Sequence, residues 1–407
     1  MGASDLLDPN SGASLNSMTP AKHNIQRRVR RRKASLAASL RRRSWVVPVM
    51  LVTAFVLAYA IHPSASNPAH PFIFLSYKIE DSADGLAQAP QYGKGLRDIA
   101  FVCFYTVFLT FTREFCMQEI FNPLARACEI ASRAKRARFA ENMYTALYIT
   151  IVGPWGMHLM HRTPVWYFNT RGMYEGFPHR THEAGFKAYY LLQAAFWMQQ
   201  VVVMVLGLEA RRKDFNQLIG HHVVTVALVA LSYRFHFTYM GIAVYITHDL
   251  SDFFLSISKT LNYVESKVQG WSFGLCIVMW IYLRHYINLR ILYSTLPGGE
   301  FSTVGPYSLQ IDWEAEQYKS PLANVITFGL LAALQLLNIF WLYCLLRAAY
   351  KFVFLGVAKD DRSEAEDEEE ETGSAVDRKS HHHALSTVMG DADVPAQGLV
   401  RRKSRQI

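Results

Sequence analysis

The sequence has few cysteines and, over most of its length, few charges. Five of its 407 residues are cysteine, and they are scattered in apolar stretches without a C-x-x-C pair, which argues against a disulfide framework and a zinc module. Residues 45–355 carry 43 charged side chains in 311 positions, about 14%, whereas globular chains average about 25%. This shortage of charge excludes a disordered protein and argues against a soluble enzyme.

The first 20 residues lack the apolar stretch that a secretory signal peptide needs, and are rich in Ser, Asn, Asp and Gly. Residues 21–43 then hold ten Lys and Arg, directly before an apolar run. Because basic residues beside a span stay in the cytoplasm, the N-terminus is predicted to be cytosolic. The net charge of +9 is therefore interpreted as a signal of topology, and no nucleic-acid partner is expected.

Long apolar runs are what the sequence does contain. A bilayer core needs about 20 apolar residues per helix, and eight segments qualify, some of them only if polar residues are tolerated: 45–61, 98–117, 142–161, 186–207, 217–233, 239–258, 271–293 and 322–347. The loops between them alternate in basic content, and an even number of spans returns the C-terminus to the cytosol. We predict an all-α polytopic membrane protein with about eight transmembrane helices.

Composition divides the chain into four parts. A basic cytosolic tail (1–44) precedes the first transmembrane helix and a lumenal loop (45–94), and the main membrane domain follows (95–355). The C-terminal tail (356–407) contains an acidic run at 360–371 that cannot build a hydrophobic core. We predict that both cytosolic tails are disordered.

Ionisable side chains interrupt two of the apolar segments, although a charged group at a helix centre costs about 2.5–3.5 kcal/mol on insertion scales. The segment 217–233 contains His221 and His222, and the segment 239–258 contains His248, Asp249 and Asp252. Asp249 and Asp252 are three residues apart and share a helix face, which Ser256 extends by four residues.

The predicted topology places these groups at similar depth. His221 would lie about 6 Å inside its helix, and Asp252 and Asp249 about 9 and 14 Å from the cytosolic end of theirs, at 1.5 Å per residue. A connection of about five residues predicts an antiparallel hairpin, in which two imidazoles face two carboxylates. Such pairs can also serve only to lock helices together, but intramembrane ionisable groups are by default a functional-site hypothesis.

These residue types suit acyl transfer. An imidazole can attack an activated acyl group or deprotonate an incoming amine, and a neighbouring carboxylate can fix its tautomer. The second carboxylate can receive a cationic amine. A di-iron site is the rival interpretation, but the histidines of HLMH (158–161) and HRTHE (179–183) belong to the opposite side of the predicted membrane, so no metal is expected.

Three stretches carry a family resemblance. The segment DFNQLIGHHVVTVALVALSYRFHFTYMGIAVYITHDLSDFFLSISKTLNY (214–263), together with 163–200 and RHYINLRIL (284–292), closely resembles the ceramide synthases of the TLC family, in their fungal form. The resemblance covers about residues 95–350. It implies a TLC-type bundle enclosing a lipid tunnel, N-acylation of a sphingoid base (sphinganine or phytosphingosine) by a fatty acyl-CoA, and the endoplasmic reticulum membrane.

The resemblance also implies roles for residues. His221, His222, Asp249 and Asp252 match the family's essential residues, and the loop 294–321 matches its chain-length-selecting region. We expect His221 to be the nucleophile or base, His222 to assist it, and the aspartates to orient imidazole and bind the acceptor. The supporting or tunnel-lining candidates are His248, Ser256, Arg284, His285 and Asn288, with core packing or interhelical hydrogen bonding as the alternative for the last three.

Acyl-CoA is expected as a co-substrate and no cofactor is expected. The family further suggests a homodimer and a small accessory membrane subunit as partners, besides the bilayer itself. The alternative function is that of a TLC-type protein that senses or transports lipid without turnover, which would not need the full His/Asp set.

Overall fold

The structure is a computed structural model that describes residues 43–79, 90–209 and 214–355. Its long elements are helices, and its strands β1 (Gln91–Tyr92) and β2 (His182–Glu183) form one short antiparallel pair. The tails predicted to be disordered, apart from residues 43 and 44, lie outside the described residues.

Every predicted apolar segment corresponds to a helix. These are α2 (Val46–Ile61), α4 (Arg97–Phe115), α6 (Arg133–His161), α7 (Ala184–Val205), α8 (Phe215–Arg234), α9 (Thr238–Tyr263), the continuous run of α10 (Gln269–Trp280), η4 (Ile281–Ile287) and α11 (Asn288–Ser294), and α13 (Pro321–Leu355). Short elements complete the fold: α3 (His70–Ile73), η1 (Cys116–Phe121), α5 (Asn122–Ala127), η2 (Trp166–Phe168), η3 (Arg171–Met173) and α12 (Glu300–Thr303).

Five helical runs of the described chain are long and apolar enough to cross a membrane. They cover Arg97–Ala127, Ala184–Val205, Phe215–Arg234, Gln269–Ser294 and Pro321–Leu355. The helix α2 is apolar but has only 16 residues. The helices α6 and α9 are long enough, but their polar side chains make them less apolar than a membrane-spanning helix of this kind. The chain is therefore an all-α, multi-pass membrane protein, as predicted.

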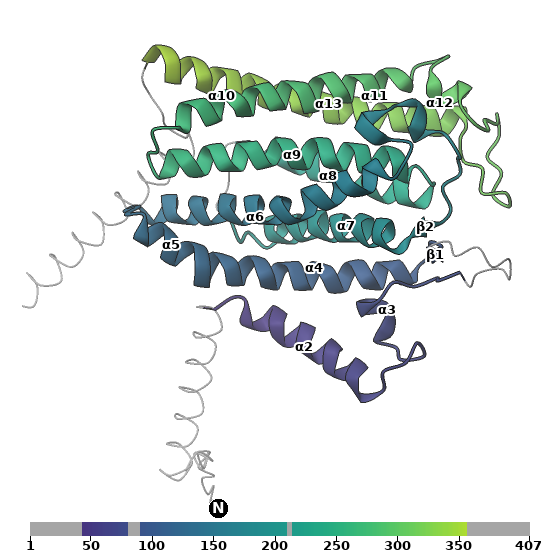
Figure 1. The fold of residues 1–407 in the computed structure, drawn as a ribbon, viewed down its shortest axis with the longest axis horizontal. Helices are drawn as coiled ribbons and strands as arrows, with labels where there is room; N and C mark the ends of the chain where they lie inside the picture. The colour runs from purple at the N-terminus through teal and green to yellow at the C-terminus, as the bar shows by residue number, and fades with distance from the viewer. Residues whose placement is uncertain (1–42, 80–89, 210–213, 356–407) are drawn as a thin grey trace, which may run out of the picture.

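The long helices other than α2 run side by side as one bundle, and α2 lies at its edge against α3 and α4 (Figure 1). The helices α8 and α9 contact each other and are joined by residues 235–237, so the predicted antiparallel hairpin is confirmed. However, α9 packs more extensively on α6 and α10 than on α8. The polar face of α9 therefore has several neighbours, and α8 is only one of them.

Close helix contacts depend on two glycines. Tyr189 of α7 packs against Gly156 of α6, and Tyr190 of α7 packs against Gly241 of α9, leaving no room for a Cβ at either glycine. Both tyrosine side chains are buried. These two contacts tie α7 to α6 and α9, in addition to its extensive packing on α4.

The bundle has two ends that differ in chemistry. We call the end where α7 finishes and α8 begins the histidine end, and the end that carries β1, β2 and α12 the loop end (Figure 1). The run from α10 to α11 widens into a π-helix at η4, Ile281–Ile287. Such π turns are rare and often occur at functional sites.

Candidate active site

Three imidazoles gather at the histidine end. His221 and His222 are buried on α8 with their ring centroids 5.8 Å apart, and the ring of His248 on α9 stacks 6.4 Å from that of His221. Trp197 of α7 meets the rings of both α8 histidines edge-on, at 5.4 and 6.1 Å. Trp341 of α13 contacts His221 from another direction, at 5.2 Å.

Backbone carbonyls orient two of these rings. The Nδ1 of His222 lies 2.8 Å from the carbonyl oxygen of Leu218, and the Nδ1 of His248 lies 2.8 Å from that of Val244, in each case one helical turn earlier. A ring that donates from Nδ1 keeps its lone pair on Nε2. Both imidazoles are therefore prepared to act as bases through Nε2.

The two carboxylates form hydrogen bonds with helices other than α8. Asp249 is buried and accepts a hydrogen bond from the amide of Gln193 on α7, whereas Asp252 accepts one from Arg284 of η4, with an N–O distance of 2.6 Å. The hydrogen bonds of both carboxylates go to these two groups, and the expectation that they also face His221 and His222 stays a prediction. Asp249 thus points toward α7 and Asp252 toward η4, and His248 is the α9 side chain stacked on His221.

Gln193 links Asp249 to the aromatic core. It is fully buried, receives a hydrogen bond from the hydroxyl of Tyr148 at 3.2 Å, and lies 3.1 Å from the hydroxyl of Tyr189. An amide that is bonded on both sides holds the carboxylate in one position. The amide of Gln193 thus fixes the carboxylate of Asp249, which directly follows His248 in the sequence.

Arg284 organises the other carboxylate. Its guanidinium is buried in the π turn and donates to Asp252, to Ser251 at 2.6 Å and to Asn338 of α13 at 3.3 Å. It also stacks over the ring of Trp280 at 4.0 Å. The side-chain amide of Asn338 in turn lies 3.5 Å from Nε2 of His248, so one guanidinium connects Asp252 with the third imidazole.

The remaining supporting candidates also take part in interhelical bonding. The amide of Gln335 on α13 accepts from Asn288 at 2.8 Å and lies 2.8 Å from Nδ1 of His285. For Arg284, His285 and Asn288 the structure thus shows interhelical hydrogen bonding, which was the alternative interpretation. Ser256 is buried on α9 one turn beyond Asp252.

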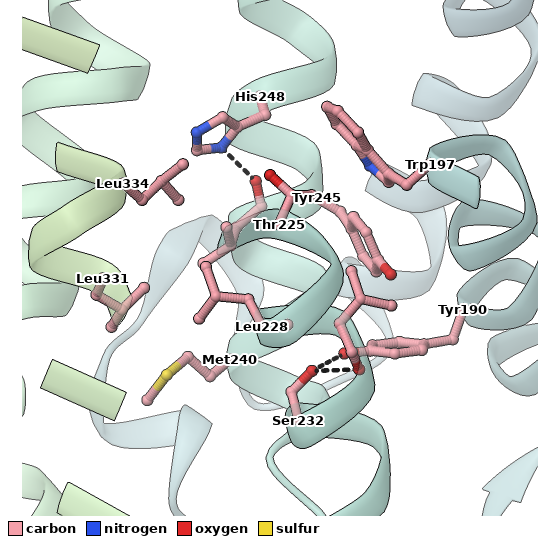
Figure 2. Close-up of a pocket in the computed structure, with 13 residues that line it drawn as sticks. Tyr190, Trp197, Thr225, Leu228, Ser232, Met240, Tyr245, His248, Leu331 and Leu334 are labelled. Carbon is pink, nitrogen blue, oxygen red and sulfur yellow. Dashed lines mark hydrogen bonds between the residues drawn. The ribbon is translucent and has the colours of Figure 1, made fainter. Parts of the chain in front are cut away.

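Two adjoining apolar cavities begin beside the imidazoles. The first, about 50 Å³, is lined by His248, Trp197 and residues of α7, α8, α9 and α13 (Figure 2). The second, about 230 Å³, shares Leu228, Ser232 and Met240 with the first and extends to Trp313 and Tyr318 near the loop end. Because they share lining residues, the two cavities adjoin along α8, and we call them together the apolar route. Of the site residues expected from sequence, His248 is the one that lines it.

The loop end also buries charge, but away from these cavities. Lys187 of α7 pairs with Asp98 of α4 at 2.7 Å, with 0% and 3% of their side chains exposed, and Tyr233 of α8 donates to the same carboxylate at 2.8 Å. Burial lowers the pKa of the nearby Lys94 to about 7, although Glu316 opposes this shift.

The histidines of the HRTHE motif (179–183) belong to this loop end. His179 and His182 are buried, and His182 lies 2.9 Å from the hydroxyl of Thr238. Desolvation by burial lowers the pKa of both imidazoles. Among the described residues, no group of three or more His, Cys, Asp or Glu side chains is arranged to hold a metal ion.

Comparison with known proteins identifies this bundle. The TLC domain model matches residues 138–347, which is over half of the chain. The chain belongs to the TLC-domain family. The matched TLC domain contains all the predicted site residues from His221 to Asn288, and it leaves α2 and α4 outside.

Curated fungal relatives cover most of the chain. It is 50% identical to the sphingosine N-acyltransferase-like protein FUM17 of Gibberella moniliformis over 89% of this chain and 93% of that protein. It is 43% identical to the sphingosine N-acyltransferase lac1 of Schizosaccharomyces pombe, over 89% and 92%. It is also 43% identical to the ceramide synthase LAG1 of Saccharomyces cerevisiae, over 81% and 78%.

The structure adds residues to the TLC-domain site that the sequence reasoning missed. Gln193, Gln335 and Asn338 are polar side chains inside apolar segments, and that position was a usable signal. Trp197 gave no such signal, because aromatic residues are common throughout this chain.

Proposed function

We propose that this protein is a ceramide synthase, which transfers a fatty acyl group from acyl-CoA to the amine of a sphingoid base. The observation that carries the proposal is the cluster of His221, His222 and His248 beside an apolar route. It occurs in a TLC domain whose relatives are named sphingosine N-acyltransferases. An acyl chain needs an apolar space, and its thioester needs a base or nucleophile next to that space.

The reaction forms a carbon–nitrogen bond and breaks the carbon–sulfur bond of the thioester. In direct transfer, an imidazole removes the proton of the attacking amine, and this proton leaves with the CoA thiolate. In covalent transfer, imidazole attacks the thioester first, CoA thiol leaves, and the amine then displaces the acyl group from imidazole. His221 is our candidate for the reacting imidazole, with His222 assisting it.

The carboxylates support this step from different positions. Asp249 is buried and held by Gln193, which suits a fixed negative charge that stabilises a nearby imidazolium. Asp252 keeps 31% of its side chain exposed while it pairs with Arg284. We assign to Asp252 the reception of the ammonium group of the sphingoid base.

We place the protein in the endoplasmic reticulum membrane, with eight spans and both termini in the cytosol. This orientation puts Arg133, Lys135, Arg136 and Arg138, at the start of α6, on the cytosolic side, where acyl-CoA is dissolved. The loop 294–321 then closes the far end of the apolar route through Trp313 and Tyr318. That position suits a wall that limits acyl chain length.

Amide formation by the purified full chain tests the proposal. The protein in lipid nanodiscs receives acyl-CoA and sphinganine, and mass spectrometry measures ceramide while a thiol reagent measures released CoA. We expect both products in equal amounts in the wild type, and neither in His221→Ala. Binding of both lipids with no product in the wild type would overturn the proposal and favour the alternative of a lipid sensor or carrier.

The covalent version has its own readout. Intact mass measurement after exposure to acyl-CoA alone would show one added acyl group on the wild-type chain. Absence of that mass in rapidly quenched samples that still make ceramide would favour direct transfer.

A further inference from the structure

Two hydroxyl groups on the wall of the first cavity have no hydrogen-bond partner among the described residues. They are Oγ1 of Thr225 on α8 and the phenolic oxygen of Tyr245 on α9. Both side chains are buried, with 8% and 4% exposure. Buried polar atoms are nearly always paired, so two unpaired hydroxyls in one cavity wall require an explanation.

The rest of the wall shows how this cavity treats its other hydroxyls. Tyr190 and Ser232 line the same cavity and bond to each other, as the dashed lines in Figure 2 show. The wall also contains Leu228, Leu331 and Leu334, which offer no hydrogen bond, and the indole N–H of Trp197, which likewise has no hydrogen-bond partner among the described residues. The missing partner is therefore expected from a molecule that enters the cavity.

Helix geometry fixes the position of the two hydroxyls relative to the imidazoles. Thr225 follows His221 by four residues and Tyr245 precedes His248 by three, so each lies one turn further into the bundle, about 5–6 Å at 1.5 Å per residue. The rings of His221 and His248 are themselves stacked 6.4 Å apart. A substrate whose reacting group lies at the imidazoles would present the next few carbons of its chain to both hydroxyls.

We propose that Thr225 and Tyr245 form a subsite for a hydroxyl group on the substrate chain, a few carbons from the reacting centre. A hydroxyl both donates and accepts, as do the side chains of threonine and tyrosine, so one substrate hydroxyl satisfies both protein groups. Every sphingoid base carries hydroxyls at C1 and C3 beside its amine, and we assign the subsite to one of the two additional hydroxyls that distinguish substrates: C4 of the base or C2 of the acyl chain. This inference rests on the proposed function and defines its substrate class.

The test compares substrates with and without the additional C4 or C2 hydroxyl, using the full chain in nanodiscs. One arm compares phytosphingosine with sphinganine at a fixed acyl-CoA, and the other compares a 2-hydroxyacyl-CoA with its unsubstituted form at fixed sphinganine. Each ratio of kcat/KM is measured for wild type, Thr225→Val and Tyr245→Phe. Tyr190→Phe is the matched control, because its hydroxyl lines the same cavity but is already bonded to Ser232.

We expect each variant to lower the preference for the hydroxylated substrate about threefold to tenfold, the effect of one ordinary hydrogen bond. The arm in which the ratio falls identifies the source of the hydroxyl, and the control keeps both wild-type ratios. Unchanged ratios in both arms would overturn the subsite, and so would an equal loss with all substrates, since that pattern points to a group common to all of them: the acyl carbonyl oxygen or the C1 and C3 hydroxyls of the base. A wild type that acylates nothing would contradict the proposed function instead.

Discussion

The two ends of the bundle both bury ionisable side chains, but they use them differently. At the loop end, Lys187 and Tyr233 both bond to the carboxylate of Asp98, and none of the three lines either cavity. At the histidine end, the rings of His221 and His248 stack beside a cavity that His248 itself lines. The difference suggests that the loop end serves stability, whereas the histidine end combines bonded ionisable side chains with a space for substrate.

The largest effect is expected from a substitution of His221, at the histidine end. Replacing it with Gln keeps a polar side chain but removes the imidazole base, so turnover should fall about 10²–10⁴-fold. His158→Gln is the matched control, since His158 is exposed on α6. Ceramide formation per folded molecule is the measurement, and a His221→Gln variant with wild-type turnover would show that the imidazole of His221 is not the reacting group.

Lys187→Met should act on stability instead. It removes one member of a buried ion pair and leaves Asp98 without that cation, which costs about 3–5 kcal/mol. Thermal unfolding in detergent should show a clear drop in midpoint, while the molecules that remain folded keep their turnover. The control is Lys267→Met at an exposed position, and an equal drop in both variants would contradict a specific role of the pair.

Arg284→Lys tests the connection between Asp252 and His248 at the histidine end. Lysine keeps the positive charge but cannot reproduce the planar fork that reaches Asp252, Ser251 and Asn338 together. We expect kcat to fall about tenfold, because the carboxylate and the imidazole of His248 lose a common anchor. Arg290→Lys, at an exposed position on α11, should leave kcat unchanged, and similar values for both variants would argue against the connection.

The smallest expected effect concerns pH at the loop end. Burial lowers the pKa of Lys94 to about 7 in the folded chain, from 10.5 as its ordinary value. Between these values the unfolded chain binds more protons, so this residue makes stability rise as pH increases from about 7 toward 10. Lys94→Met should flatten that rise by a few degrees in unfolding midpoint, and an unchanged slope would show that Lys94 is not the group responsible.

The sequence predicted the helices well because long, mostly apolar segments in a membrane must satisfy their backbone hydrogen bonds internally, as helices do. All eight apolar segments form helices, and the hairpin of α8 and α9 follows from their short connection. The burial of His221, His222 and Asp249 also agrees with the cost of exposing such groups to lipid.

What the sequence could not predict is which helices supply the partners. The position of Asp249 along α9 was evident, but its bond to Gln193 depends on how α7 is held by two tyrosine–glycine contacts. The reach of Arg284 depends on a π turn, for which no local sequence signal was available. Partner choice is a property of the packed bundle, and hydropathy and spacing do not specify it.

The most direct test measures turnover per folded molecule and unfolding midpoint together for His221→Gln and Lys187→Met. We predict opposite effects of the two variants. His221→Gln loses turnover with a nearly unchanged unfolding midpoint, and Lys187→Met lowers the unfolding midpoint with nearly unchanged turnover. Turnover that falls in proportion to the midpoint in both variants would contradict the division between a catalytic and a structural end.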